Sequence, residues 1–275
     1  MTYSIKRPDN FDIAQIFDCG QCFRFSKHLS KNDTYCGVAF GRYLEITQTD
    51  NDVIFNCDKD TYNNLWHSFL DLDNNYSLYI DSFSNDTVLY EASKFSSGIR
   101  LLKQDPWETL CSFIISQNNN IPRIKGIIEN MSKAYGESFE CDGNTYYSFP
   151  TAKALYDAGT DAIFALKTGF RAKYIYDAAS KVAGGELDLN AIFDMPLDDA
   201  MQALMTIKGV GPKVASCVLL FGFSKYDAFP IDVWVKKILK NYYSEGMSPH
   251  FTGKHAGIAQ QYLFYYERCK NNVYL

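Results

Sequence analysis

The 275-residue chain has no long apolar run. No stretch approaches the roughly eighteen consecutive apolar residues that a membrane-spanning helix needs. The N-terminal sequence MTYSIKRPDNF also lacks the apolar core of a signal peptide. We therefore expect a soluble, intracellular protein of the cytoplasm and nucleoid or of a nucleus, with no membrane partner. Its 47% hydrophobic content suffices for one large core or two smaller cores that share an interface.

The chain also lacks an excess of positive charge. Its formal net charge of −5 argues mildly against nucleic acid as a partner, because phosphate contacts need clustered cations. The distribution of charge carries more weight than the sum. Between Met201 and Lys240 the chain has six lysines against two aspartates, so a local basic face remains available for phosphate groups.

No disulfide framework or metal-binding cysteine cluster is recognisable. The eight cysteines are scattered over a chain too long to need disulfides, and we expect reduced thiols. Cys19 and Cys22 have the spacing of a redox or zinc pair, but no second pair stands at ligand spacing. We therefore expect no metal ligated by side chains.

What is present divides the chain into two patterns. Up to about residue 90, segments such as TYCGVAFGRYLEITQT and DVIFNC show loose alternation of aromatic and β-branched residues between Asn/Asp-rich turns. From Thr87 the period becomes that of amphipathic helices. These patterns predict an α+β fold, with an antiparallel β-sheet domain over residues 1–94 and a mostly helical, two-lobed region over 95–275. We expect no strands in the second two-thirds.

The most informative stretch runs from Leu204 to Cys217. Apolar positions before Lys208 indicate one helix, and Gly209, Val210 and Gly211 then supply a tight turn. Pro212 suits the first position of a new helix, because a proline leaves no N–H unpaired there. The pattern predicts a helix-hairpin-helix whose backbone amides can bind a DNA phosphate without reading sequence. An ordinary glycine turn between two packed helices is the alternative.

Lys213 is the candidate nucleophile. It falls in the first turn of the second helix, where the positive end of the helix macrodipole disfavours an ammonium and favours the neutral amine. Cys217 follows one turn later on the buried stripe. Asp232 precedes the amphipathic segment VWVKKILKNYY, so we expect it to cap that helix. A carboxylate there can also stabilise the cationic sugar that develops as a base departs, or move a proton.

These features resemble a known superfamily. The hairpin, the run Gly209–Lys213 and the Pro-Ile-Asp232 loop resemble the helix-hairpin-helix, Gly/Pro-rich loop and aspartate of the DNA glycosylases that share this motif. The lysine is typical of the bifunctional members. Further stretches resemble the 8-oxoguanine DNA glycosylase family and follow its order along nearly the whole chain, namely Gly20–Phe25, Gln104–Glu108, Ser116–Ile124, Gly169–Tyr174 and Ala256–Gln260.

The resemblance implies a set of base-recognition residues. Gly20 would offer its carbonyl to the ring N–H that oxidised guanine has and guanine lacks. Gln260 would pair with the Watson-Crick edge of the flipped base, while Phe264 and Cys217 would sandwich its two faces. The alternatives from the residues alone are a strand bulge or turn at Gly20 and an ordinary amphipathic helix pair for the other three.

A second implied set handles the opposite strand. Asn118, Arg123 and Arg171 would donate hydrogen bonds to the orphaned base, and Phe170 would act as the wedge in the stack, where the animal enzymes have tyrosine. Otherwise, Asn118 caps or ends a helix and the two arginines are surface charges. Trp234 also departs from the animal pattern, which has histidine two residues after the aspartate, and His255 is not an evident equivalent.

The implied activity is base excision repair by an N-glycosylase with AP lyase activity. Lys213 would attack the sugar of a flipped 8-oxoguanine nucleotide with help from Asp232 and leave an imine that allows β-elimination. The partner would be double-stranded DNA containing oxidised guanine, and we expect a monomer. No cofactor is expected. Only Cys269 follows Cys217, so the four-cysteine iron–sulfur loop of related branches is absent. A structural monovalent cation at the hairpin carbonyls is compatible with the resemblance.

Two other functions stay open at this point. An alkylated-base glycosylase would use the aspartate without a catalytic lysine, and Lys213 speaks against that function. A non-catalytic DNA-binding protein would use the hairpin as an anchor alone. Covalent trapping through the lysine separates these possibilities.

Overall fold

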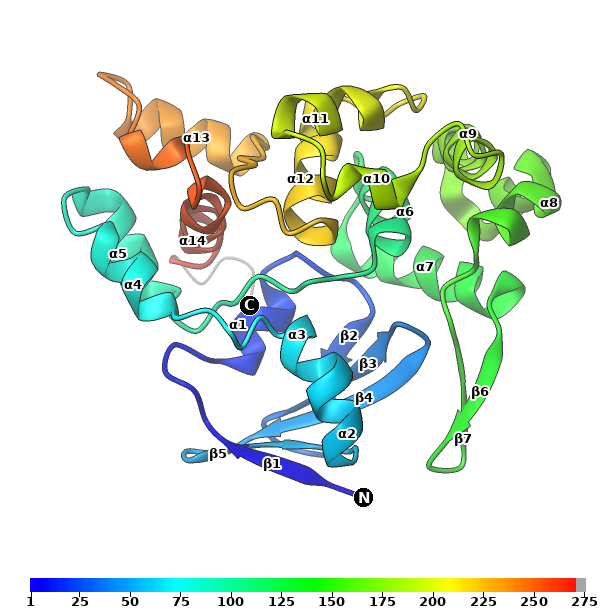
Figure 1. The fold of residues 1–275 in the computed structure, drawn as a ribbon, viewed down its shortest axis with the longest axis horizontal. Coiled ribbons are helices and arrows are strands. Elements are labelled where there is room, and N and C mark those ends of the chain that lie inside the picture. Colours follow the sequence, from blue (N-terminus) through cyan, green and yellow to red (C-terminus); the bar gives the residue numbers. More distant parts are fainter. Residues whose placement is uncertain (271–275) are drawn as a thin grey trace.

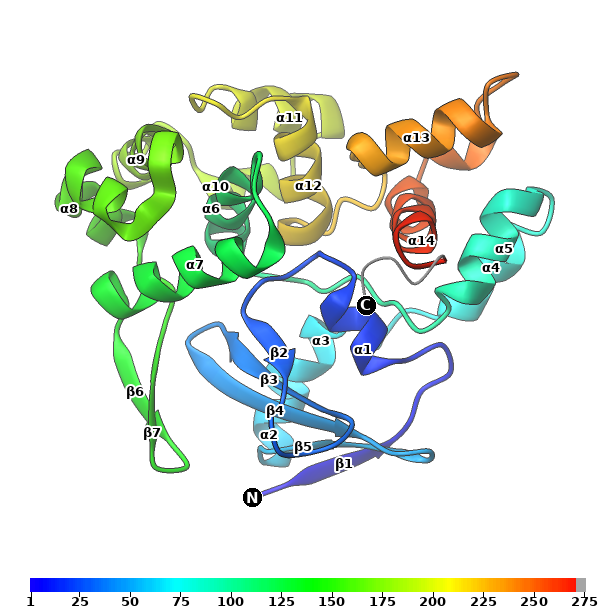
Figure 2. The same cartoon turned by 180° about the vertical axis from the view of Figure 1, so that it is seen from behind.

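A computed structural model describes residues 1–270 and shows a β-rich part beneath a larger layer of helices (Figure 1; Figure 2 gives the reverse view). The β-rich part is a five-stranded antiparallel sheet with the strand order β1-β5-β4-β3-β2. Its strands are β1 (Tyr3–Lys6), β2 (Phe25–Lys27), β3 (Thr34–Ala39), β4 (Arg42–Gln48) and β5 (Asp52–Phe55). The predicted antiparallel sheet is therefore confirmed.

The sheet encloses the smaller of two cores. Alternation along β4 buries Leu44 and Ile46 on one face, as expected for a strand with one solvated side. That face is covered by helix α1 (Ile13–Asp18) and by a continuous helical stretch that contributes Trp66. The stretch comprises α2 (Lys59–Thr61), a π-helical turn (Tyr62–Trp66) and α3 (His67–Phe69).

The larger core lies among the helices that follow. These helices are α4 (Tyr76–Ser82), α5 (Thr87–Phe95), α6 (Pro106–Ser116), α7 (Ile121–Tyr135), α8 (Ala152–Ile163), α9 (Ala172–Ala183), α10 (Leu189–Ile192), α11 (Leu197–Met205), α12 (Pro212–Gly222), α13 (Val233–Tyr242) and α14 (Ala256–Cys269). Shorter helical turns cover Phe164–Thr168, Gly169–Arg171 and Pro249–Phe251. Helices α4 and α5 pack beside α14 (Figures 1 and 2). Residues before position 94 thus contribute to both cores.

The expectation that the second two-thirds contains no strands is wrong at one place. Strands β6 (Ser138–Cys141) and β7 (Asn144–Tyr147) form a hairpin that extends beside the main sheet (Figure 1). Asp142 and Gly143 both have positive φ, at 48° and 74°. An Asp-Gly pair favours this two-residue turn, and the flanking strands are too short for their alternation to stand out.

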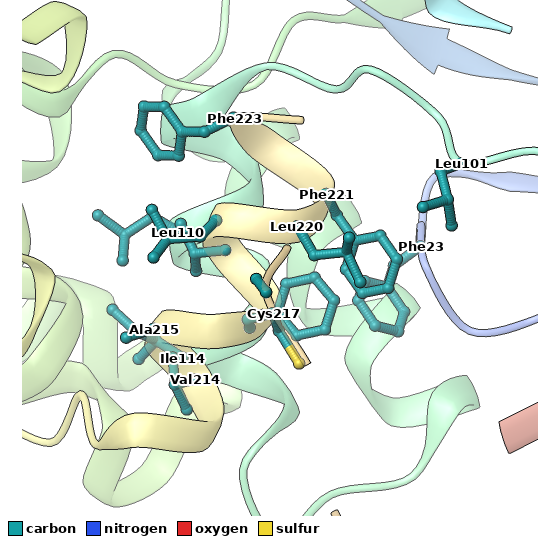
Figure 3. Close-up of a cluster of buried hydrophobic side chains, with 14 of the residues drawn as sticks. Phe23, Leu101, Leu110, Ile114, Val214, Ala215, Cys217, Leu220, Phe221 and Phe223 are labelled. Atoms are coloured by element: carbon teal, nitrogen blue, oxygen red, sulfur yellow. The ribbon is translucent and has the colours of Figure 1, made fainter. Parts of the chain in front are cut away.

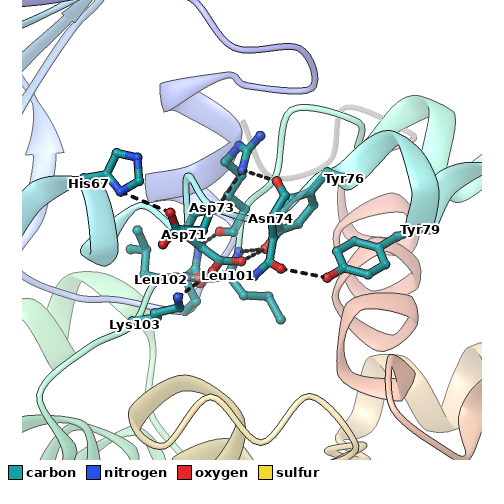
Figure 4. Close-up of polar contacts among 11 residues, drawn as sticks. His67, Asp71, Asp73, Asn74, Tyr76, Tyr79, Leu101, Leu102 and Lys103 are labelled. Carbon is teal, nitrogen blue, oxygen red and sulfur yellow. Dashed lines mark hydrogen bonds and ion pairs between the residues drawn. The ribbon is translucent and has the colours of Figure 1, made fainter.

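A buried polar network joins the two parts. Asp71 is fully buried, and its carboxylate accepts hydrogen bonds from Asn74 at 2.7 Å and from the Tyr76 hydroxyl at 2.9 Å. Lys103 forms an ion pair with the same carboxylate at 2.9 Å, and Arg100 donates to the Asp71 carbonyl at 2.8 Å (Figure 4). A buried carboxylate with this many partners fixes the connection between the sheet and the helices.

Candidate active site

The predicted hairpin joins α11 to α12. Gly209 has a φ of +78°, and a Cβ there would stand 2.4 Å from the Tyr174 ring, so only glycine fits. Val210 is buried and anchors the turn, whereas Gly211 is extended at the N-cap of α12. No side chain caps that helix start. Its first amides are therefore available to an anion such as a phosphate.

Helix α12 is held against α6 by a dense apolar contact. Figure 3 shows Val214 and Ala215 of α12 beside Ile114 of α6. All three side chains are almost completely buried. The helix that carries the candidate nucleophile is therefore rigidly placed in the larger core.

Lys213 lies in the first turn of α12, as predicted. Its side chain is half-buried, and Nζ stands 5.4 Å from the centroid of the Phe113 ring. Cys217 follows one turn later and is 4% exposed. Burial raises the pKa of the Cys217 thiol, while the nearby Lys213 opposes that shift. The thiol is therefore a neutral apolar surface beside the amine.

Asp232 caps α13, which confirms the predicted structural role. Its Oδ1 accepts hydrogen bonds from the backbone N–H groups of Trp234 at 3.0 Å and Val235 at 2.8 Å. These bonds hold the carboxylate at the edge of a pocket that Lys213 also lines.

This pocket is small, with a cavity volume of about 50 Å³. Six of its lining residues were predicted from the sequence, and the structure brings them together from loops and helices far apart in the chain: Gly20, Lys213, Cys217, Asp232, Gln260 and Phe264. The other lining residues are Phe113, Phe221, Pro230 and Gln261. The sequence did not indicate Gln261, because adjacent positions on a helix face different directions.

Gln260 has an unusual environment within the pocket. It is 4% exposed, and its Oε1 is buried without a hydrogen-bond partner among residues 1–270. A buried amide oxygen in this state costs about 1–3 kcal/mol. Such a cost points to a partner that arrives with a ligand.

Gly20 lies in the loop between α1 and β2 with a φ of +82°, so the site is a turn and not a strand bulge. A Cβ there would stand 3.5 Å from both Phe264 Cε1 and Arg268 Nη1. The loop therefore lies directly against one face of α14.

A wide groove of about 990 Å³ adjoins the pocket and shares Lys213, Asp232 and Phe264 with it. Asn118 and Phe170 line this groove, as do Gly211, Trp234, Lys236 and Arg268. Phe170 is 48% exposed, and its ring contacts Arg171 and Tyr174 on its other side.

The two predicted arginines differ sharply. Arg171 is 2% exposed, and its guanidinium donates to the backbone carbonyls of Gln117 at 2.8 Å, Asn118 at 2.9 Å and Thr168 at 3.2 Å. Arg123 is exposed, with one weak bond to a carbonyl. Arg171 is thus a brace between two loops in this structure, and its contact with an unpaired base stays a prediction.

Within residues 1–270, no three side chains of the metal-binding types His, Cys, Asp and Glu gather as a metal site. No helix in the same range has the length and apolarity to cross a membrane.

Comparison with known proteins matches both parts of the chain. Residues 4–110 match the family model described as 8-oxoguanine DNA glycosylase, N-terminal domain. Residues 111–251 match the model described as HhH-GPD superfamily base excision DNA repair protein.

Two relatives illustrate the similarity in sequence. An N-glycosylase/DNA lyase of Saccharomyces cerevisiae is 40% identical over 158 residues, which is 53% of this chain but only 42% of that protein. A probable N-glycosylase/DNA lyase of Methanothermobacter thermautotrophicus is 32% identical, covering 68% of this chain and 69% of the relative.

The crystal structure of Clostridium acetobutylicum 8-oxoguanine glycosylase/lyase, in complex with double-stranded DNA containing cytosine opposite 8-oxoguanine, superposes with a TM-score of 0.89 at 37% identity. The superposition covers 98% of this chain and 99% of the Clostridium chain. The fold, the hairpin, the pocket and these matches agree, and the chain belongs to the 8-oxoguanine DNA glycosylase family of the HhH-GPD superfamily.

Proposed function

We propose that this chain excises 8-oxoguanine from double-stranded DNA as an N-glycosylase/DNA lyase, with Lys213 as the nucleophile and Asp232 assisting. The observation that carries the proposal is the shared pocket, in which the lysine and the aspartate border the same cavity as Gln260 and Gly20. A non-catalytic DNA-binding protein has no need for a pocket in which these four residues meet beside its hairpin.

The chemistry follows from the two polar groups at the pocket edge. Neutral Lys213 Nζ attacks the anomeric carbon, the N–C1′ bond breaks, and the base leaves with its electron pair and a proton. The negative charge of Asp232 stabilises the cationic sugar as that bond lengthens. Opening of the sugar ring then gives an imine between Lys213 and the sugar. Loss of a C2′ proton expels the 3′ phosphate and nicks the strand.

Base recognition depends on groups that already stand in place. Gln260 meets the Watson-Crick edge, which would satisfy its buried Oε1. Phe264 and Cys217 contact the two faces of the base, and the carbonyl of Gly20 accepts the N–H that only the oxidised base carries.

DNA binding uses the groove and the hairpin. The free amides at the start of α12 bind a phosphate, and Lys236 adds positive charge along the groove. Phe170 enters the stack when the nucleotide leaves it, and Asn118, Arg123 and Arg171 contact the base left behind. A monomer inside the cell, and a cation at the hairpin carbonyls of Gly209, Val210 and Gly211, remain predictions from the sequence and its resemblance.

A cleavage assay tests the proposal. Duplexes with 8-oxoguanine opposite each of the four bases are incubated with the native chain and with Lys213→Gln. We expect base release and strand nicking by the native chain and neither by the variant, while both bind the duplex. Lys236→Gln is the matched control, because this lysine lines the groove but not the pocket. Excision of the lesion by Lys213→Gln at the native rate would overturn the proposal.

A further inference from the structure

The loop that carries Gly20 is held through its backbone carbonyls. Gln261 on α14 donates from Nε2 to the carbonyl of Cys19 at 2.9 Å. Gln104, just before α6, donates from Nε2 to the carbonyl of Gln21 at 2.8 Å. The Gly20 carbonyl between these two accepts no hydrogen bond from any residue in the described range 1–270. It is the free acceptor in a loop whose neighbouring acceptors are occupied.

Arg268 reaches the same loop from the groove side through one long, weak bond. Its Nη1 donates to the carbonyl of Asp18 at 3.4 Å and lies close to the Cα of Gly20, where a Cβ would be 3.5 Å away. Arg268 follows Phe264 by one helical turn, and both line the groove. One face of α14 thus carries the aromatic wall of the pocket and the donor that holds the loop.

The side chain of Gln21 restrains the loop from within the protein. It is fully buried, and its Nε2 donates to the carbonyls of Ile16 at 2.9 Å and Arg100 at 2.8 Å. Its Oε1 accepts from the backbone N–H of Leu102 at 2.9 Å. These bonds connect the loop to the segment that joins the two cores.

We infer that Gln261 and Arg268 are positioning residues for lesion discrimination, which hold the loop so that the Gly20 carbonyl stays unpaired at the pocket that Gly20 lines. The inference rests on the proposed function. A single hydrogen bond separates 8-oxoguanine from guanine only if its acceptor is fixed, because a mobile carbonyl loses the bond or accepts from water instead. Gln261 binds the peptide group between Cys19 and Gly20, and Arg268 binds the peptide group between Asp18 and Cys19.

Two substrates separate this role from a general one. Excision of 8-oxoguanine requires contact between the base and Gly20, whereas nicking of a duplex with a preformed abasic site requires Lys213 but no base. Gln261→Met keeps the length of the side chain and removes the donor. We expect this variant to lose about 10- to 100-fold in single-turnover excision of 8-oxoguanine, with abasic-site nicking unchanged.

Arg268→Met tests the groove side of the loop, and Arg268→Lys is its conservative rescue. We expect Arg268→Met to lower excision selectively and Arg268→Lys to restore most of the rate. Lys236→Met removes the same charge from the same groove without touching the loop. It is the matched control, and it should change both reactions by the same factor.

The outcomes are distinguishable from a failure of the proposed function. Equal losses in excision and abasic-site nicking for both Gln261→Met and Arg268→Met would show a merely structural role and overturn the inference. Unchanged excision would overturn it as well. Abasic-site nicking that survives in Lys213→Gln would instead contradict the proposed function.

Discussion

The base pocket and the opposite-strand region differ in how ready their side chains are. In the pocket, Gln260 presents an unpaired acceptor, and Asp232 is fixed by two backbone bonds. Across the groove, Phe170 and Arg123 extend into solvent, and Arg171 is occupied by backbone carbonyls. The pocket that we propose for the lesion is preformed, whereas the proposed opposite-strand contact needs rearrangement before Arg171 can meet a base.

This difference indicates which of the two regions determines substrate specificity. A preformed pocket retains its donors and acceptors without a conformational cost, so a wrong base is rejected by groups left unpaired. In the opposite-strand region, the hydrogen bonds of Arg171 must break before it can contact a base, and this cost reduces the free energy of binding. We therefore expect lesion choice to be stricter than opposite-base choice.

Asp232 offers the largest effect short of removing the nucleophile. Asp232→Ser keeps a capping oxygen but removes the negative charge, and we expect excision to fall by about 10²-fold or more. The thermal midpoint should stay close to that of the native chain. Asp232→Ala loses the cap as well, and its unfolding free energy should fall by about 1 kcal/mol. Native excision by Asp232→Ser would contradict a role for the charge.

Gln260 separates activity from stability. Gln260→Met replaces an unsatisfied buried amide with a side chain of similar shape, so the unfolding free energy should stay equal or rise by about 1 kcal/mol. Excision of 8-oxoguanine should fall by about 10-fold or more, because the Watson-Crick edge loses its partner. Chemical denaturation and single-turnover kinetics measure the two effects. A clear loss of stability would show that Oε1 has a partner in solution.

Arg171 and Arg123 are expected to differ in their effects on stability and on opposite-base choice. Arg171→Ala removes the brace between the loops, and we expect a loss of about 1–3 kcal/mol in unfolding free energy. Arg123→Ala should change stability by less than about 0.5 kcal/mol, since the side chain is exposed. Its effect should appear in the ratio of excision rates opposite cytosine and opposite adenine. A destabilised Arg123→Ala with an intact ratio would reverse these assignments.

Glu108 provides a separate test, in the pH dependence of stability. Burial raises the pKa of Glu108 from 4.5 to about 7, although Arg24 opposes the shift. The folded protein therefore holds a proton that the unfolded chain releases near pH 4.5, so this group stabilises the fold fully at low pH. The contribution is lost as the pH rises toward 7. Glu108→Gln should remove this slope between about pH 4.5 and 7, and an unchanged slope would contradict the shift.

The helical hairpin could be predicted because its signals are local. Gly209 and Pro212 specify a turn and a helix start, and Asp232 specifies a cap, whatever surrounds them. Assembly of the pocket followed from the family resemblance, since no local pattern brings Gly20 to Gln260.

The remaining features depend on contacts distant in sequence. Gln261 meets the carbonyl of Cys19 across 242 positions, and composition says nothing of such a pair. The alternative that Arg171 is a surface charge is wrong, because its buried guanidinium donates to three backbone carbonyls that no sequence pattern brings to it. The hairpin of β6 and β7 was missed because its strands have only four residues each.

The central claim is that the Lys213 amine attacks the sugar of a flipped, oxidised nucleotide. Borohydride capture on a duplex with 8-oxoguanine, followed by mass spectrometry of the cross-linked peptide, tests it most directly. We predict a single covalent adduct on Lys213 and no capture in Lys213→Gln. An adduct on another lysine, or undiminished capture in the variant, would contradict the account.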